Sequence, residues 1–397
     1  MSLLPQRRTA QIGGVNVVGR LRDESGVGEA ARAVVAALDA ARIPVLPAEP
    51  PGPSPSRQHV PFETVELAHA VFPVTVLCMT ALETPGFAQV AGPGLFRGRH
   101  TIGLWWWEVE TFPEVMHGGF DWVDEVWAGS DHIAAAIGPP GAARGVPTTR
   151  VRIPVRRAPA TARTRAELGL PEGFVFLTVF GYYSSVARKN PLGAIDAFTR
   201  AFAPAEGPSL VVKCIDHEAH PAEHAALLAM ADRHPDVHVL AGYSDRDEMD
   251  ALVQRCNAVV SLHRAEGFGF TPAEAMAQGV PVIATRYSGN LEYMTNDNAL
   301  LIDGPLVPVG PDGGPYPASA RWADPDLDAA AAAMRSLVAH PEMAQRLGAQ
   351  ARMDLARTHG AAGCGETMRA ALAPHTDHHR WAKARLAAAR LARGRSS

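Results

Sequence analysis

Short apolar runs alternate with longer amphipathic stretches along almost the whole chain. The short runs are typical of buried strands, and the longer stretches carry apolar residues at the spacing of one helix face. The predicted strands cover residues 15–18, 43–46, 74–77, 101–104, 123–127, 174–180, 209–214, 237–241 and 258–260. The predicted helices cover residues 28–41, 191–202, 222–234, 246–254, 326–340, 341–358 and 380–393. This alternation is typical of helices packed on parallel sheets, so the predicted fold class is α/β.

A polar, proline-containing stretch over residues 155–163 interrupts the alternation. It has no periodicity and is predicted to link two domains, residues 1–155 and residues 165–375. Segment 376–397 is predicted to form a closing basic helix. The length of 397 residues is ample for two hydrophobic cores. Between residues 306 and 320 the chain is rich in Gly and Pro, which predicts an excursion at the surface.

The composition is that of an ordinary globular protein, and it narrows the range of partners. Hydrophobic residues make up 47% and charged residues 20% of the chain, and the net charge of −4 does not indicate nucleic-acid binding. The four cysteines are isolated, which indicates reduced thiols and not a zinc site. The N-terminus lacks the apolar segment of a signal peptide, and no apolar run approaches the ~18 residues that span a bilayer. A cytoplasmic location is therefore expected. In the helix predicted over 380–393 the arginines surround the axis, which favours packing against the first domain over contact with a membrane surface.

The most informative segment spans residues 261–281 and follows the last predicted strand. A glycine loop there leads into a helix that is predicted to begin with Thr271 as its N-cap and Pro272 at its first position. Free backbone N–H groups and the positive end of a helix dipole suit a phosphate. Glu266 lies in the loop and Glu274 one turn into the helix, so two carboxylates flank the site.

This segment resembles the Glu-x7-Glu motif of the retaining, GT4-type glycosyltransferases, and residues 284–293 resemble the family segment that follows it. The resemblance implies a GT-B fold, in which two doubly wound Rossmann-like domains face a central cleft. It also implies that Glu266 contacts the donor sugar and that Glu274 hydrogen-bonds the ribose of the nucleotide. A structural alternative stays open for Glu274. Residues 271–274 also fit a capping box, in which this carboxylate would only satisfy a backbone N–H group.

Two adjacent cations, Arg188 and Lys189, precede the helix that is predicted from residue 191. Arginine offers a planar fork and lysine a point charge, a combination that suits a diphosphate. The stretch resembles the Ser-x3-Arg-Lys-Asn-Pro segment of one GT4 branch, where basic residues hold the diphosphate. Gly181 departs from that pattern, because an Asp commonly stands at its position. The alternative is that the two cations form only a solvated pair near the helix N-terminus.

Other positions of the second domain carry weaker signals. Gly242 and Tyr243 match the place where the family contacts the nucleotide base. Asp245 and Asp247 form an Asp-x-Asp pair, but carboxylates at a helix start favour the helix dipole. GT-B enzymes as a class need no metal for the chemistry, so no metal or other cofactor is expected. His263 is interpreted either as a donor contact or as a partly buried, packed side chain.

The first domain contributes a glycine-rich helix start. Gly26, Gly28 and Ala31 give the form Gly-x-Gly-x-x-Ala, and Glu49 follows roughly 20 residues later, as in a dinucleotide-binding fingerprint. Against that interpretation, residues 19–24 separate the glycines from the strand, and Glu49 lies beside two prolines and not cleanly at a strand end. The loop instead resembles the glycine loop of GT4 first domains, which approaches the donor phosphates across the cleft.

A tryptophan-rich segment over residues 100–113, together with residues 124–130, resembles the Trp-Glu region of the same GT4 branch. Aromatic rings are good platforms for sugars, and carboxylates bind hydroxyl groups or act as bases. Glu108 is expected to contact the acceptor or the sugar, and at least one Trp is expected in the core. His117 is the nearest candidate for a His that many GT4 enzymes carry in this region, although its match is poor.

The sequence thus predicts a retaining glycosyltransferase that moves a sugar from a nucleoside diphosphate sugar to a hydroxyl group. The acceptor stays open between a glycan, a lipid-linked sugar and a small natural product. The predicted catalytic residues are Glu266, Lys189, Arg188 and Glu108. The predicted donor-binding residues are Gly26, Gly28, Gly242, Tyr243, Gly267, Phe268, Gly269, Phe270, Thr271 and Glu274. Two alternatives remain: an NAD-dependent oxidoreductase that uses residues 26–31, and a GT-B binding subunit without transfer activity, which the absent Asp at Gly181 keeps open.

Overall fold

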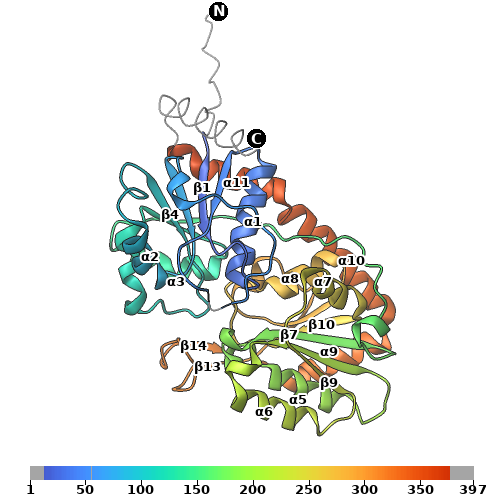
Figure 1. Ribbon diagram of the computed structural model, residues 1–397. Coiled ribbons are helices and arrows are strands. Elements are labelled where there is room, and N and C mark those ends of the chain that lie inside the picture. The colour runs from blue at the N-terminus through green and yellow to red at the C-terminus, as the bar shows by residue number, and fades with distance from the viewer. Residues whose placement is uncertain (1–12, 55, 376–397) are drawn as a thin grey trace, which may run out of the picture.

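The computed structural model describes residues 13–54 and 56–375. Two six-stranded sheets make up two domains, and every strand pair inside each of these sheets is parallel. Helices cover both faces of each sheet (Figure 1). The predicted α/β class with two doubly wound domains is therefore confirmed.

The first sheet runs in the order β2-β1-β3-β4-β5-β6. Its strands are β1 (Val15–Gly19), β2 (Val45–Ala48), β3 (Val74–Cys78), β4 (His100–Leu104), β5 (Glu125–Ala128) and β6 (Thr148–Arg150). Its helices are α1 (Gly26–Ala40), α2 (Glu83–Ala91) and α3 (Asp131–Ala142). The central strands β1 and β3 are buried throughout, as expected for parallel strands with helices on both faces.

The second sheet runs in the order β12-β11-β10-β7-β8-β9. Its strands are β7 (Val175–Gly181), β8 (Ser209–Ile215), β9 (Val237–Ala241), β10 (Ala258–Ser261), β11 (Val282–Thr285) and β12 (Leu300–Ile302). Its helices are α4 (Val186–Lys189), α5 (Pro191–Ala201), α6 (Pro221–Ala231), α7 (Arg246–Arg255), α8 (Phe270–Gln278), α9 (Leu327–Ala339) and α10 (Pro341–Thr358). The strand order reverses between β7 and β10, and ligands of open α/β sheets bind at the carboxyl ends of strands at such a reversal.

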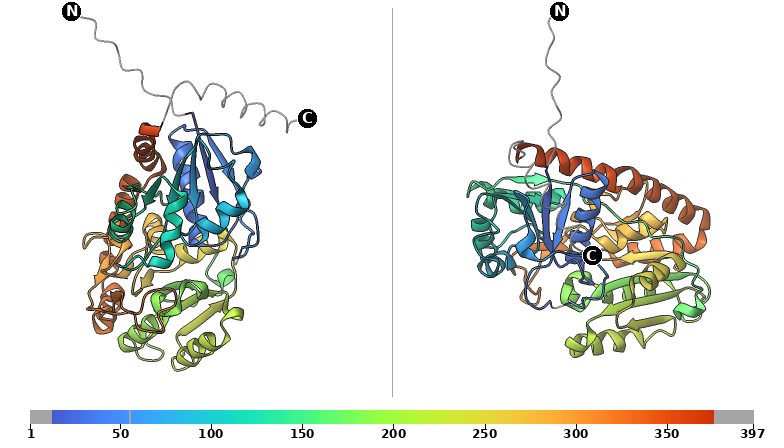
Figure 2. Two further views of the ribbon diagram at one scale, coloured as in Figure 1. Left: turned by 90° about the vertical axis from the view of Figure 1, so that its left-hand side faces the viewer. Right: turned by 45° about the horizontal axis from the view of Figure 1, so that its top comes forward.

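Two segments connect the domains. Residues 151–164 run outward without regular structure, and the chain returns between α10 and α11 (Ala361–Leu372) (Figure 2). The two segments meet, because the Val155 N–H donates to the His359 carbonyl at 2.9 Å. Helix α11 packs against α1 of the first domain, so the chain has crossed back before residue 376. The helix predicted within segment 376–397 lies outside the described residues.

The structure differs from the sequence prediction mainly in short elements. Strands β6, β11 and β12 and helices α2, α3 and α11 were not predicted, and β2 lies two residues later than expected. The Gly/Pro-rich stretch forms an antiparallel hairpin of β13 (Leu306–Pro308) and β14 (Arg321–Ala323). Its connecting loop carries Tyr316, which is buried against the first domain and not at the surface.

Among the described residues, none of the helices combines the length and the apolar character that crossing a membrane requires.

The close packing of α11 on α1 depends on a glycine. A methyl group at Gly365 would lie 2.1 Å from the Ala37 carbonyl oxygen and 2.8 Å from the Ala41 Cβ atom. Gly365→Ala should therefore lower the free energy of unfolding by about 1–3 kcal/mol, because the helices must move apart. Gly363→Ala, on an exposed part of the same helix with no atom within 4 Å, is the matched control. It should be neutral or stabilising by up to about 1 kcal/mol. Denaturant unfolding measures both, and equal effects would contradict the packing argument.

Candidate active site

Three charged side chains meet at the reversal of the second sheet, two of them buried (Arg188 and Glu266) and one, Lys189, half-buried. Arg188 and Lys189 end α4, which follows β7, and Glu266 follows the neighbouring strand β10. The Arg188 Nη1 atom lies 3.0 Å from Glu266 Oε2, and Lys189 Nζ donates to the other carboxylate oxygen, Oε1. Glu266 is 6% exposed. The two cations are therefore neither a solvated pair nor separate from Glu266.

Each charged group of this cluster changes the pKa of its neighbours. Burial alone would raise the pKa of Glu266, but Lys189, Arg188 and His263 together lower it to about 2. Burial lowers the pKa of Lys189, against the attraction of Glu266. For Arg188, burial is outweighed by Glu266, which raises its pKa. The cluster thus holds two cations and one carboxylate, and it carries a net positive charge.

The backbone around Glu266 is fixed by the segment that follows β11. Ser288 Oγ accepts a hydrogen bond from the Glu266 N–H at 2.7 Å, and the Gly289 N–H donates to the Glu266 carbonyl at 2.8 Å. A methyl group at Gly289 would come within 1.8 Å of the Gly267 carbonyl oxygen. This close approach explains why a glycine stands at position 289.

The His263 side chain packs beneath the glycine loop that contains Glu266 and bonds to neighbouring side chains. It is completely buried, and its Nδ1 and Nε2 atoms lie 2.9 Å from Ser261 Oγ and 3.2 Å from Asn290 Oδ1, respectively. Burial lowers its pKa, so the ring is neutral at pH 7. Because both ring nitrogens have protein partners, the structure favours the packed interpretation of His263 over a donor contact.

Helix α8 begins two residues earlier than predicted. Its N-cap is Gly269, with a φ of +85°, and not Thr271. The capping box is not formed, because the carboxylate of Glu274 accepts a hydrogen bond from Arg246 Nη2. Burial raises the pKa of Glu274, opposed by Arg246 and reinforced by Glu29. Arg246 Nη1 also lies 3.4 Å from Glu29 Oε2 of α1, so Glu274 takes part in a charge network that joins the two domains.

Of the two glycines at the start of α1, the packing of the preceding loop explains Gly28 but not Gly26. A methyl group at Gly28 would lie 2.7 Å from the carbonyl oxygens of Arg20 and Asp23, so glycine lets the preceding loop fold onto the helix. Ser25 is the N-cap of α1 and accepts from the Gly28 N–H at 3.1 Å. Gly26 has open space around it.

Glu49 directly follows β2, so one sequence argument against a dinucleotide fingerprint was wrong. The structure instead gives this carboxylate a local task, since Glu49 Oε1 accepts a hydrogen bond from the Arg22 N–H at 3.0 Å. It thereby holds the loop between β1 and α1. The long separation between strand and glycines is confirmed, because residues 20–25 lie between β1 and α1.

A pocket of about 350 Å³ lies where the two domains meet near α7. Its lining residues are Glu24, Arg57, His59, Val60, Pro61, Tyr243, Asp245 and Arg246. The Arg57 guanidinium stands over the Tyr243 ring, 4.4 Å from its centroid. Gly242, with a φ of +103°, turns the chain at this point, and its carbonyl accepts a hydrogen bond from Lys213 Nζ. Asp245 caps α7 by accepting from the Glu248 N–H at 2.7 Å, as expected for a carboxylate at a helix start.

The tryptophans after β4 divide between core and interface. Trp105 and Trp107 are buried in the first domain, whereas Trp106 is half-buried and packs edge-on against Phe268 and Phe270 of the second domain. Ser130 Oγ, the N-cap of α3, donates to the Gly267 carbonyl at 2.8 Å. The first domain therefore holds the glycine loop directly.

Glu108 lies close to the charged cluster, as its electrostatic effect on both Arg188 and Lys189 indicates. Tyr316, from the β13–β14 hairpin, donates its hydroxyl hydrogen to Glu108 Oε2 at 2.9 Å. Burial and the neighbouring Glu108 raise the pKa of Tyr316. His117 lies apart and contacts Arg144 at 3.0 Å, whereas His132 at the start of α3 reaches the Glu108 carbonyl at 2.8 Å.

Several interface residues escaped the sequence analysis. Arg321 forms a double ion pair with Glu110 at 2.8 and 3.1 Å, and Arg150 joins Asp131 at 2.6 Å and also pairs with Glu292 of the second domain. Each of the inter-domain pairs is separated by well over a hundred residues, so no local pattern could have revealed it.

Comparison with known proteins agrees with this geometry. Residues 128–367, more than half of the chain, match a family described as family 4 glycosyltransferases in conflict systems. No curated protein sequence matches the chain.

Three solved structures show the same fold as this chain. HepE of Anabaena, in complex with UDP and glucose, is similar with a TM-score of 0.65 and 13% identity, covering 91% of this chain and 99% of HepE. Sucrose-phosphate synthase of Thermosynechococcus elongatus gives 0.64 and 17%, with coverages of 90% and 98%. A glycosyltransferase of Rickettsia africae ESF-5 gives 0.62 and 12%, with coverages of 91% and 97%. The predicted GT-B fold is confirmed.

The charged cluster predicts a difference in acid stability. Because the pKa of folded Glu266 is about 2, below its ordinary value of 4.5, its ionised form contributes stability above pH 4.5 that is lost as the pH falls toward 2. Over this range the free energy of unfolding should fall by about 3 kcal/mol more in the wild type than in Glu266→Gln. Denaturant unfolding at several pH values measures this. Glu342→Gln, which removes an exposed partner of His340, should follow the wild type. Equal pH slopes for wild type and Glu266→Gln would mean that the cations do not keep Glu266 ionised.

Proposed function

The chain belongs to the family 4 glycosyltransferases in conflict systems, and from this premise we propose that it transfers a sugar from a nucleoside diphosphate sugar to an acceptor hydroxyl with retention of configuration. The enzyme class follows from the family. The donor, the roles of the residues and the stereochemistry are the proposal. The observation that carries it is the charged cluster of Arg188, Lys189 and Glu266 at the carboxyl ends of β7 and β10.

The two cations suit the leaving group of such a transfer. When the bond between C1 of the sugar and the phosphate oxygen breaks, the electron pair stays on the diphosphate. Preorganised cations in a water-poor site stabilise that charge better than solvent does. Arg188 is buried and Lys189 half-buried, with the Glu266 carboxylate between them, and α8 begins at Phe270, four residues after that carboxylate. Glu266 would release part of its ion pairing to the diphosphate and orient the donor sugar.

The low pKa of Glu266 bears on the stereochemistry. A carboxylate held by two cations is a weak nucleophile, so a covalent sugar–enzyme intermediate on Glu266 is disfavoured. The proposed route is attack by the acceptor on the same face from which the diphosphate leaves. The departing phosphate oxygen then takes the proton of the acceptor hydroxyl. Glu108, close to both cations, would hold the acceptor or the sugar.

The pocket beside Tyr243 is the proposed site of the nucleotide base. Its position next to Arg246 and Glu274 would place the ribose at the Glu274 carboxylate, which Arg246 now contacts. HepE was solved with UDP-glucose, so UDP-sugars are the first donors to test. The acceptor stays open between a glycan, a lipid-linked sugar and a small natural product.

The carboxylate that Gly181 lacks has a neighbour that can replace it. Asp216 directly follows β8, and its Oδ2 atom lies 3.7 Å from the place of a Cβ atom at position 181. Its other oxygen accepts the hydroxyl hydrogen of Tyr243. The Asp216 carboxylate at this place therefore weakens the case for a binding subunit without activity.

A nucleotide panel tests the donor. Thermal unfolding with GDP, UDP, ADP, TDP and NAD, each at millimolar concentration, should show a rise of a few degrees with one nucleoside diphosphate, because a ligand at 100 times its dissociation constant adds about 2.7 kcal/mol. The matching sugar donor, incubated without an acceptor, should be slowly hydrolysed to a sugar of unchanged anomeric configuration. A shift with NAD alone would overturn the proposal in favour of an oxidoreductase that uses Gly26 and Gly28.

Glu274→Ala should weaken binding of that nucleotide by about 1–3 kcal/mol, because a hydrogen bond to a charged group is lost. Calorimetric titration measures the change. Asp250→Ala is the control, since Asp250 Oδ1 lies 3.5 Å from Arg246 Nε, so this variant takes one carboxylate away from Arg246 and leaves Glu274 in place. Nucleotide affinity should be nearly unchanged in this control. Equal losses in both variants would mean that Glu274 acts only by holding Arg246.

A further inference from the structure

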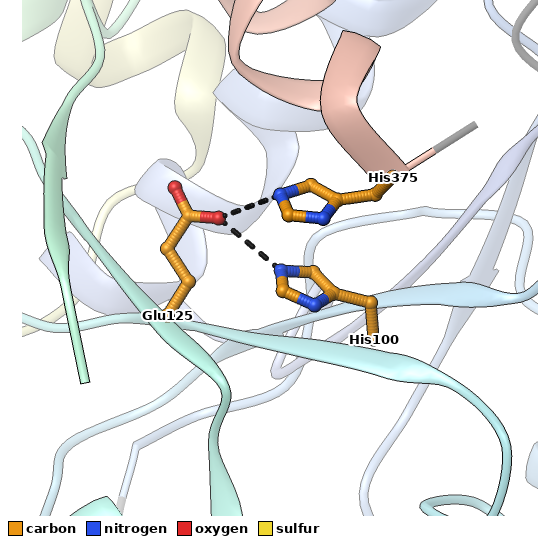
Figure 3. Close-up of side chains that lie close together, drawn as sticks. All are labelled: His100, Glu125 and His375. Carbon is orange, nitrogen blue, oxygen red and sulfur yellow. Dashed lines mark hydrogen bonds and ion pairs between the residues drawn. The ribbon is translucent and has the colours of Figure 1, made fainter. Parts of the chain in front are cut away.

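A second cluster of ionisable side chains lies at the edge of the first sheet opposite the cleft. His100 is the first residue of β4 and Glu125 the first residue of β5, so both stand at the amino ends of parallel strands. His375, at the end of the short 3₁₀ turn after α11, faces them from the returning chain. Figure 3 shows both imidazole rings directed at the same carboxylate.

The three side chains converge on one point. His100 Nε2 lies 3.2 Å and His375 Nε2 lies 3.0 Å from the same oxygen, Glu125 Oε2. Ligand atoms of all three residues lie within 4.8 Å of one another. In a tetrahedral zinc site with bonds of about 2.0–2.1 Å, two ligand atoms are about 3.3 Å apart. The two distances from Glu125 Oε2 to the histidine nitrogens, 3.2 and 3.0 Å, are therefore close to the ligand–ligand distance in such a site.

The surroundings also resemble those of metal ligands. Trp127 Nε1–H donates to Glu125 Oε1 at 3.2 Å, which leaves Oε2 facing the two histidines. The carboxylate of Asp124 lies 3.9 Å from His100 Nδ1, on the ring nitrogen that would carry the proton when Nε2 binds a metal. Carboxylates and donors behind the ligands orient them in this way in known metal sites.

We propose that His100, Glu125 and His375 bind a divalent transition metal ion of the zinc type, with water at the fourth position. Two imidazoles and one carboxylate are a ligand set that zinc accepts. Binding would turn the two rings out of their present stack, in which the centroids are 3.5 Å apart, so that both lone pairs point at one ion. His100 and His375 are partly exposed, which gives the ion a path from solvent.

The position indicates a structural role. The ion would tie the end of the returning segment to β4 and β5, beyond the packing of α11 on α1. It is independent of the glycosyl transfer, because the cluster lies at the amino ends of strands of the first sheet, whereas the charged cluster at Glu266 lies at the carboxyl ends of strands of the second sheet. The sequence could not reveal it, since His375 is 250 residues from Glu125 and the three residues form no spaced motif.

Zinc titration of the chelator-treated, full-length protein against a chromophoric zinc indicator tests the proposal. The wild type should bind about one Zn²⁺ per chain at micromolar or lower free concentration, and its melting temperature should rise by a few degrees. Glu125→Gln and His100→Ala should each lose this stoichiometric binding. Trp127→Phe keeps all three ligands but removes the indole N–H that holds Glu125 Oε1, together with part of a fully buried side chain. It should weaken the affinity about 10-fold or more.

The double variant His378→Ala/His379→Ala is the control, since these histidines lie outside the described residues and close to His375 in the sequence. It should bind zinc like the wild type. Absence of tight binding in the wild type would overturn the proposal. So would binding that survives in Glu125→Gln and His100→Ala but is lost in the control. Circular dichroism of each variant separates loss of the site from loss of the fold.

Discussion

The buried pairing of Arg188 and Lys189 with Glu266 is the interaction on which the site depends. A carboxylate at 6% exposure is stable in its ionised form only because two cations contact it. The geometry follows from topology, since β7 and β10 are neighbours although about 80 residues of chain separate their carboxyl ends. Removing either sign of charge would leave the other buried and unpaired, which is far costlier than the loss of an exposed ion pair. The excess positive charge is what a diphosphate can use.

The faces of the cleft pair with each other in this structure. Arg246 of the second domain contacts Glu29 of the first, and Tyr316 donates to Glu108. Groups proposed to bind the donor are therefore engaged with protein partners. A nucleotide sugar must exchange these contacts for its own, so its net affinity is smaller than the sum of its contacts. The same exchange couples donor binding to the separation of the domains.

Sequence patterns predicted the site better than the connections around it. The strands and the charged residues at their ends carry local signals, which is why Arg188, Lys189 and Glu266 were found before their contacts were known. The sequence prediction placed the N-cap of α8 at Thr271 because threonine is a common N-cap residue. In the structure Gly269 is the N-cap, in a left-handed conformation that glycine adopts without strain. Contacts such as Tyr316 with Glu108 were not predictable, because they join segments 208 residues apart and depend on how the domains face each other. Short edge strands, such as β6 and β12, have too few residues for a periodic signal.

The hydrogen bond between Val155 and His359 has a mechanical consequence. The Val155 N atom and the His359 O atom are 2.9 Å apart, so the two segments that connect the domains lie side by side at this point. They therefore form one narrow connection between the domains and not two separate ones. Two domains joined by one narrow connection can rotate apart about it. They cannot slide past each other without breaking the hydrogen bond between the two segments. We therefore expect the domains to open by rotation about this connection, with the largest displacement at the ends of the cleft far from it. Arg321 and Glu110 sit on facing sides of the cleft, joined only by an exposed ion pair. The ease of that rotation should therefore depend on the salt concentration of the surrounding solution.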